Sequence, residues 1–247
     1  MSTMEKRLRF LALCNAAALC ALGSLTLLAF TRQDRVRFTE VDVERLNIIG
    51  TNGQPVLVLA NRRLIPGPSM SGKQYPAAVA DGRDLVSGMI FFNEQGDEVG
   101  GLIFNGIPKD SGYSAVGHLS FDQWKQNQVV ALQYIDGGTS RRAGLNVWDR
   151  PTDVTMDEQL DRGLRMMEAT GAERDSLRAA AAAARARGEY GVQRLFVGSR
   201  DRTAQLVLRD TEGRVRVRLY VDSTDVARLE FLDESGRTVA AYPSDAR

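Results

Sequence analysis

LVLRDTEGRVRVRLYV, residues 206–221, places two alternating runs on either side of a short turn. In the second run Val215, Val217 and Leu219 alternate with arginines, a period of two that is typical of a half-buried β-strand. The carboxylate of Asp210 can accept a backbone hydrogen bond two residues further on, and Gly213 can adopt the positive φ that other residues resist. The stretch therefore predicts an antiparallel hairpin.

The same layout recurs along the chain. Two clear copies are MIFFNEQGDEVGGLIF at 89–104, with its turn at 93–96, and LEFLDESGRTVAAY at 229–242, with its turn at 233–236. A weaker copy is LNIIGTNGQPVLVL at 46–59, and further strands are predicted at 119–121, 129–134 and 144–148. Repeated hairpins at irregular spacing predict a mainly β fold, an antiparallel hairpin-repeat sheet built as a meander, a sandwich or an open barrel. Residues 62–83, with three prolines, predict a long surface loop.

The copy at 89–104 also has the glycines and acids of a ligand loop. It lacks the G-K-[ST] ending of a phosphate loop and the ligand spacing of a calcium loop, so its glycines are interpreted as turn chemistry. Gly100 and Gly101 stand where the other copies carry side chains. This difference predicts a bulge or a close backbone approach.

Residues 152–190 interrupt the β pattern with a predicted helical insert. Thr155 is expected at the N-cap with Glu158 reaching back in a capping box. Apolar residues at helical spacing follow, namely Met156, Leu160, Leu164 and Met167. Gly171 is expected to end or bend this helix, and a second helix is expected from Glu173 to about residue 187. The insert is interpreted as a helical hairpin packed on the sheet or projecting as a spacer, or else as a partner-binding arm.

Residues 10–30, FLALCNAAALCALGSLTLLAF, carry no charge. An apolar helix of about 20 residues spans the hydrocarbon core of a bilayer, so the segment predicts a transmembrane anchor. A cleaved signal peptide would have a shorter apolar region and a small-residue cleavage site. A lipoprotein signal would have a small residue before its cysteine, whereas Leu13 and Leu19 precede Cys14 and Cys20.

Basic residues lie on both sides of this span, with Lys6, Arg7 and Arg9 before it and Arg32, Arg35 and Arg37 after it. The positive-inside rule mildly favours a cytoplasmic N-terminus, because Asp34 dilutes the second group. We therefore expect a single-pass protein with a tail at 1–9, an anchor at 10–30 and an extracytoplasmic, periplasmic domain. That domain would comprise a first β part at 31–151, the insert at 152–190 and hairpins at 191–247.

Composition excludes several classes of function. A net charge of +1 gives no basic surface for nucleic acid. Both cysteines lie in the apolar segment and His118 is the only histidine, so a cysteine or zinc site in the β domain is excluded and no metal or cofactor is predicted. A Ser-His-Asp triad would have His118 as its one available base. No catalytic residue is assigned.

The most site-like segment is SGYSAVGHLSFDQWKQNQ at 111–128, which combines glycines, aromatic rings, amides and a carboxylate. Tyr113, Asp122, Trp124 and Gln126 are its candidate ligand-binding residues, because aromatic rings beside amides suit a sugar or a peptide. The alternative is a packed loop that Trp124 anchors. Glycoside hydrolysis through paired carboxylates stays open, with Glu98, Asp122 and Asp149 as candidates.

Four segments resemble a group of uncharacterised bacterial proteins with one N-terminal span: RFTEVDVERLNIIGTNG, NEQGDEVGGLIF, HLSFDQW and AGLNVWDRP. The resemblance covers residues 37–242 and implies a bacterial, membrane-anchored β domain without implying an activity. The expected function is a non-enzymatic binding or scaffolding module, with the lipid bilayer contacted through residues 10–30 and an unidentified protein or glycan as partner. The alternative is an envelope hydrolase that acts on glycans.

Overall fold

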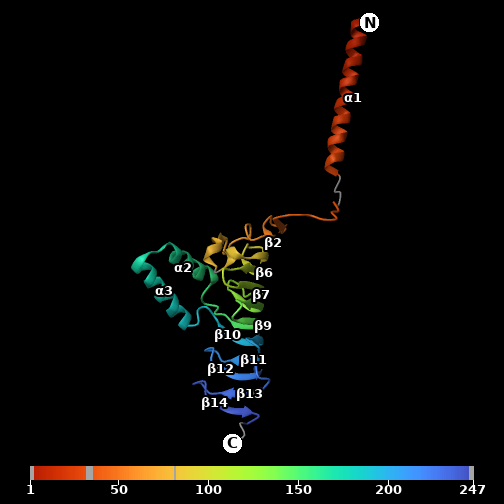
Figure 1. Cartoon of the computed structure of the whole chain (residues 1–247). Helices are drawn as coiled ribbons and strands as arrows, with labels where there is room; N and C mark the ends of the chain where they lie inside the picture. The colour runs from red at the N-terminus through yellow and green to blue at the C-terminus, as the bar shows by residue number, and fades with distance from the viewer. Residues whose placement is uncertain (1–2, 32–35, 81, 245–247) are drawn as a thin grey trace. The chain divides into compact units, whose positions relative to one another are not determined.

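The structure is a computed structural model that describes residues 3–31, 36–80 and 82–244. It divides into two compact units, one within residues 1–42 and one within residues 43–247 (Figure 1). Residues 32–35, which include the predicted flanking charges Arg32 and Arg35, lie outside the described residues.

Helix α1, Thr3–Thr31, forms the N-terminal unit. Its stretch Thr3–Ser24 is long and apolar enough to cross a membrane, and none of it is buried within the structure. A signal sequence would satisfy the same criteria. The expected anchor at residues 10–30 lies within α1, although the side chains of residues 25–31 are outside the described part. Within the expected tail at residues 1–9, the described residues from Thr3 onward are already helical.

The second unit is built on one twelve-stranded antiparallel sheet. Its strands are β1 (Arg45–Ile49), β2 (Pro55–Ala60), β5 (Ser87–Phe92), β6 (Glu98–Pro108), β7 (Tyr113–Asp122), β8 (Gln128–Asp136), β9 (Arg141–Asp149), β10 (Val192–Arg200), β11 (Thr203–Arg209), β12 (Val215–Val221), β13 (Ala227–Leu232) and β14 (Thr238–Tyr242). Each strand pairs with the next one in this order. The fold is therefore a meander, and in the described residues β1 and β14 are the open edges, so the sheet does not close into a barrel.

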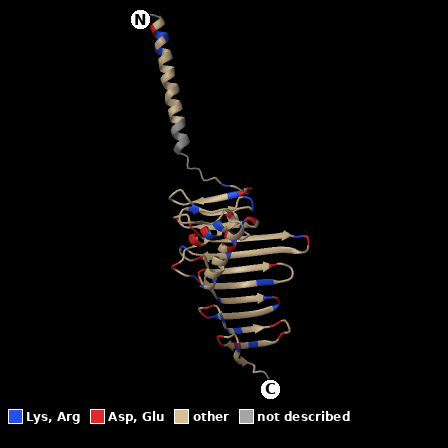
Figure 2. Ribbon diagram, turned by 90° about the vertical axis from the view of Figure 1, so that its left-hand side faces the viewer, with Lys and Arg blue, Asp and Glu red and all other residues tan. Residues whose placement is uncertain are grey.

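Acidic residues gather at the hairpin ends of the sheet (red in Figure 2). In the β11–β12 turn, Asp210 Oδ1 accepts hydrogen bonds from the backbone nitrogens of Glu212 (3.2 Å) and Arg214 (2.9 Å). Asp233 does the same for Ser235 and Arg237 in the β13–β14 turn, at 2.9 and 3.0 Å. The predicted turn chemistry is thus confirmed, and each carboxylate also pairs with the arginine that ends its turn.

The glycine pair of the hairpin at 89–104 lies at an irregularity of the β5–β6 ladder. The register shifts between Phe91 and Phe92, as the predicted bulge requires. Gly100 has φ +138, and a Cβ there would lie 2.3 Å from the carbonyl oxygen of Ser120. On the same face the rings of Phe91 and Phe121 stack across Gly100, with centroids 6.4 Å apart. Both predicted features, the bulge and the close approach, are present.

The helical insert forms α2 (Met156–Glu168) and α3 (Gly171–Ala186), which lie on one side of the strands in Figure 1. Thr155 is the N-cap residue, but its side chain makes no capping hydrogen bond, so the predicted capping box is wrong. The backbone nitrogen of Met156 instead donates to the carbonyl oxygen of Lys125 (2.9 Å), which ties the start of α2 to the β7–β8 turn. Gly171 begins α3, whereas a start at Glu173 was predicted.

The predicted surface loop at 62–83 is partly buried. It contains β3 (Ser69–Met70), β4 (Lys73–Gln74) and the 3₁₀ turn η1 (Ala77–Val79), and a second 3₁₀ turn, η2, follows at Arg83–Leu85. Met70 and Tyr75 pack against Leu160 of α2 in a small hydrophobic cluster. The prolines restrict the backbone of the segment. Because burial of Met70 and Tyr75 removes their large side chains from water, the segment packs between the sheet and α2.

The two faces of the sheet therefore differ. Alternate residues such as Val58, Ile90 and Ala131 point to the face that carries the 61–86 segment and α2, and each is 1% exposed. We call this the covered face. The residues between them point to the other face, which carries no helix or loop of the described sheet unit.

Candidate functional site

The structure separates the four predicted ligand-binding residues. Tyr113 begins β7 and Asp122 ends it, so about 30 Å of extended strand lies between them. Trp124 and Gln126 lie in the turn that follows Asp122. Asp122, Trp124 and Gln126 are thus brought to one end of the sheet, and Tyr113 to the opposite end.

Tyr113 lies in a charged cluster at the β8–β9 turn. It hydrogen-bonds with Asp136, which also accepts from the backbone nitrogen of Gly138 (2.9 Å) and from Arg141 Nε (2.7 Å). The Gly138 hydrogen bond, followed by that of Arg141, lowers the pKa of Asp136 to about 2. The cluster keeps a charged carboxylate in a turn, which is a structural role.

Gln126 is buried, whereas Trp124 is exposed to solvent. Gln126 is 1% exposed, and its amide donates to the carbonyl of Val154 (2.6 Å) and accepts from Gln159 (3.3 Å), so it holds α2 against the sheet. Trp124 is 63% exposed, with Lys125 Nζ 5.6 Å from its ring centroid. Trp124 therefore does not anchor the turn, and its ring is available to a ligand.

Asp122 belongs to a buried acidic pocket on the covered face. A cavity of about 110 Å³ there is lined by Arg83, Glu98, Asp122 and residues of the 61–86 segment and α2. Arg83 forms an ion pair with Glu98. Within the described residues, Arg83 Nη1, Glu98 Oε2 and Asp122 Oδ1 are buried without a hydrogen-bond partner. These three atoms face a cavity of the size that holds ordered water.

Burial raises the pKa of Asp122 to about 7, and the negative charge of Glu98 adds to this effect. Burial also raises the pKa of Glu98, against the lowering effect of Arg83. Of the three carboxylates considered for glycoside chemistry, two are therefore brought together. Asp149 is placed elsewhere, on the rim of β9, where it pairs with Arg194.

His118 lies on the same face as this pocket. Burial, and then the positive charge of Arg83, lowers the pKa of His118. Its Nδ1 is 3.0 Å from Gln133 Nε2, so the ring is held by a neighbour in β8. In the described ranges, no group of three or more histidine, cysteine or acidic residues gathers into a metal site.

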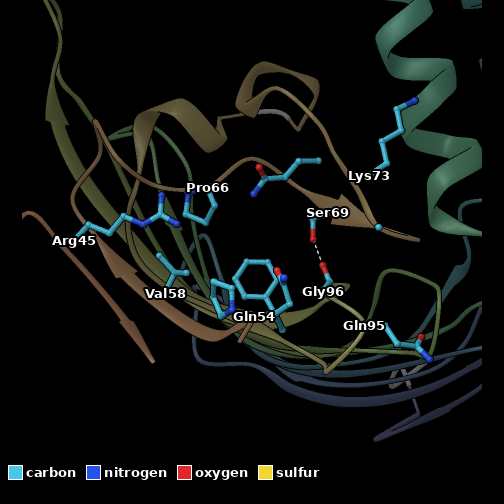
Figure 3. A pocket seen from close by; sticks show the side chains of 12 residues that line it. Arg45, Gln54, Val58, Pro66, Ser69, Lys73, Gln95 and Gly96 are labelled. Atoms are coloured by element: carbon cyan, nitrogen blue, oxygen red, sulfur yellow. Dashed lines mark hydrogen bonds between the residues drawn. The ribbon is translucent and has the colours of Figure 1, made fainter. Parts of the chain in front are cut away.

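A groove at the β1 end of the covered face was not predicted from the sequence. It has a volume of about 600 Å³ and lies between the first strands and the 66–74 segment. Figure 3 shows Arg45, Val58 and Pro66 on one side of it and Ser69 on the other, where Ser69 Oγ donates to the carbonyl of Gly96. Lys73 extends toward α2, where it pairs with Asp161. These residues are distant in sequence, so no local pattern points to the groove.

The most extensive surface feature is the uncovered side of the sheet, which we call the apolar face. Register places side chains from β1 to β14 on it, and the large apolar ones that stay exposed include Leu46, Ile48, Leu59, Phe104, Phe121, Leu132, Tyr134, Leu145, Val197, Leu208, Leu219, Val221, Phe231 and Tyr242. Their exposed fractions run from 38% to 78%. At the strand positions paired in register on this face, the charged residues are Asp136, Arg141 and Asp149. Asp136 pairs with Arg141 at one margin, and Asp149 pairs with Arg194 at the opposite margin.

Comparison of the chain with protein-family models, with curated proteins and with solved structures finds no match. We therefore infer the function from the surfaces of this chain. The period-two pattern in the sequence already indicated one apolar face per strand. It could not indicate that the covering segments would all lie on the opposite side.

Proposed function

We propose that this chain is a single-pass, membrane-anchored protein of a bacterial envelope whose β domain serves as a binding or scaffolding module. The apolar face is the observation that carries the proposal. Contiguous apolar patches above a few hundred Å² are rare on monomeric soluble proteins and mark interaction sites. The apolar face spans the whole sheet, so its permanent exposure to water would be energetically unfavourable.

Anchoring is supported by α1, whose stretch Thr3–Ser24 is apolar and unburied. Lys6, Arg7 and Arg9 before the apolar segment favour a cytoplasmic N-terminus and an extracytoplasmic domain. The bacterial setting rests on the sequence resemblance. Fusion of alkaline phosphatase after Arg247 tests the orientation: an active reporter supports it, and an inactive one places the domain in the cytoplasm.

Site-specific photocrosslinking tests the binding role. A photoreactive amino acid replaces Phe121 or Leu132 on the apolar face of the full chain in the membrane of producing cells. A third variant carries it at Val226, an exposed apolar residue in the β12–β13 turn. We expect light-dependent protein adducts from the two face positions and none from the turn. Absence of adducts from both face positions would contradict the proposal.

A hydrolase that acts on glycans is the second candidate, because Glu98 and Asp122 share one pocket and the pKa of Asp122 is raised to about 7. A carboxyl group that is protonated near neutral pH can serve as a general acid. The candidate ranks second because the cavity of about 110 Å³ is smaller than the usual ligand pocket of about 300 Å³ or more. Glycan turnover by the full chain that is lost in Asp122→Asn would favour it over the binding module.

A further inference from the structure

We infer that the apolar face docks the apolar face of a second copy of this chain, so that two sheets pack face to face about a twofold axis. The inference rests on the proposed function and names its partner. Two antiparallel sheets that pack through their apolar faces form the core of a β-sandwich, with about 10 Å between the sheets. Each copy supplies one such sheet with its second layer missing.

The face is compatible with itself. In a twofold interface each patch meets its own copy, so a charge near the centre would meet a like charge. The charged positions in register on the face, Asp136, Arg141 and Asp149, lie at its margins, where Asp136 pairs with Arg141 and Asp149 pairs with Arg194. The centre of the face is formed by uncharged residues such as Leu132, Val197 and Leu219, so a twofold interface there would bury no charge.

The available area is sufficient for a stable dimer. Fourteen large apolar side chains on the face are 38% to 78% exposed. If each exposes roughly 70 Å², about half of a large side chain, the face offers on the order of 1,000 Å². A standard protein interface buries about 800 Å² on each partner, so this surface exceeds the requirement.

The distribution of charge favours a protein partner over a lipid surface. Figure 2 shows acidic and basic residues together at the hairpin ends that border the face. A charged rim around an apolar centre is the anatomy of a protein interface. A surface that binds lipid headgroups would carry mainly lysine and arginine beside the apolar residues, whereas the chain has 32 basic and 31 acidic residues.

Anchoring would also favour pairing of copies. Two chains anchored in one membrane diffuse only within the plane of that membrane. This confinement raises their effective concentration relative to free diffusion in solution. The interface can therefore form at low copy number.

The test measures the protein mass of the full chain in mild detergent by size exclusion with light scattering. Val197 is 40% exposed at the centre of the face, and Val226 is 41% exposed in the β12–β13 turn, so the two give a matched pair of substitutions. We expect a mass of two chains for the unmodified protein and for Val226→Asp, and half that mass for Val197→Asp. Circular dichroism shows whether each variant is folded.

A second variant keeps the test decisive if Val197→Asp does not fold. Leu132→Thr combined with Leu219→Thr introduces β-branched side chains, which are favourable in strands, while removing apolar surface, and it should weaken the dimer at least tenfold. One chain in the unmodified protein would overturn the inference, with or without bound lipid in the measured mass. A dimer that survives in the folded face variants would also overturn it, because α1 or an edge strand would then hold the copies together.

The two proposals fail separately. Adducts from Phe121 to a protein of different mass, together with a monomeric chain in detergent, would keep the binding module and remove the second copy as its partner. Absence of any adduct would remove both.

Discussion

Asp122 carries a proton at a pH where surface carboxylates have lost theirs. Burial and the nearby charge of Glu98 raise its pKa to about 7, and Oδ1 has no hydrogen-bond partner among the described residues. An unfolded chain would hold the same carboxyl near its ordinary pKa of about 3.9. Between these two values the folded protein therefore binds a proton that the unfolded chain has released.

The stability of the sheet unit should fall as pH rises from about 4 to about 7 and then change little, because the folded state binds more protons over that window. Asp122→Asn removes this dependence. We expect the variant to gain on the order of 2–4 kcal/mol over the unmodified protein at about pH 8, and much less at about pH 4. Urea unfolding in detergent, followed by tryptophan fluorescence, measures it. Asp149→Asn is the control on the sheet rim, and an equal gain there would contradict the account.

Asp97 connects the 61–86 segment to two turns of the sheet. It is 1% exposed and accepts hydrogen bonds from the backbone of Ser71 (2.6 Å) and the amide of Asn93 (3.0 Å), while Lys125 Nζ lies 2.6 Å away. Burial alone would raise the pKa of Asp97, but the hydrogen bonds from Lys125, Asn93 and Ser71 outweigh it and hold the pKa below the ordinary value. One carboxylate thus joins the β5–β6 turn to the β3–β4 hairpin and the β7–β8 turn.

Asp97→Ala should cost about 3 kcal/mol or more, because it leaves the partly buried Lys125 without its partner. Asp233→Ala removes a similar turn carboxylate from an exposed hairpin, and it should cost much less because water can replace its hydrogen bonds. Chemical denaturation of both variants tests the difference. Equal losses would mean that Asp97 acts only within its own turn.

At the scale of the elements, the hairpins were predictable and the covering layer was not. An Asp or Asn followed three residues later by Gly is a local signal, and the structure confirms it at Asp210 and Asp233. The burial of Met70 and Tyr75 depends on Leu160, some ninety residues further along the chain. No local pattern carries that information, so residues 62–83 were interpreted as an exposed loop.

The candidate site shows the same division. Asp122 and Trp124 are neighbours in sequence, and the structure keeps them together. Tyr113 has the right chemistry, but strand β7, which contains Gly117, lies between it and Trp124. Glu98 comes beside Asp122 only through the pairing of β6 with β7.

The bulge at Gly100 gives a prediction for an element. With φ +138 and a Cβ position 2.3 Å from the Ser120 carbonyl oxygen, Gly100→Ala forces the β6 and β7 backbones apart. We expect a loss of about 2 kcal/mol or more. Gly106 lies in the same strand with open space around its Cβ position, so Gly106→Ala should be close to neutral. Thermal unfolding of the two variants decides, and equal melting temperatures would contradict the strain.

At the scale of the sheet unit, the 61–86 segment and α2 pack on one side of the sheet, and the other side is left open. The covered side contains the small core, the acidic pocket and the groove. The apolar face has the alternation of a sandwich strand without the second sheet, and a packed second layer is what such strands ordinarily have. A partner that supplies this layer would bury the apolar face, and its binding would be the function of the domain.

Protection of the apolar face in the intact membrane tests this central claim most directly. A cysteine at Leu219, which is 50% exposed on the face, is compared with one at Trp124, which is 63% exposed in a turn, after Cys14 and Cys20 are replaced by serine. The rate of maleimide labelling is measured in membranes and again in detergent after dilution. We expect at least tenfold slower labelling at Leu219→Cys than at Trp124→Cys in membranes, and similar rates after dispersal. Equal rates in membranes would contradict it, because the apolar face would then be open to water where the protein works.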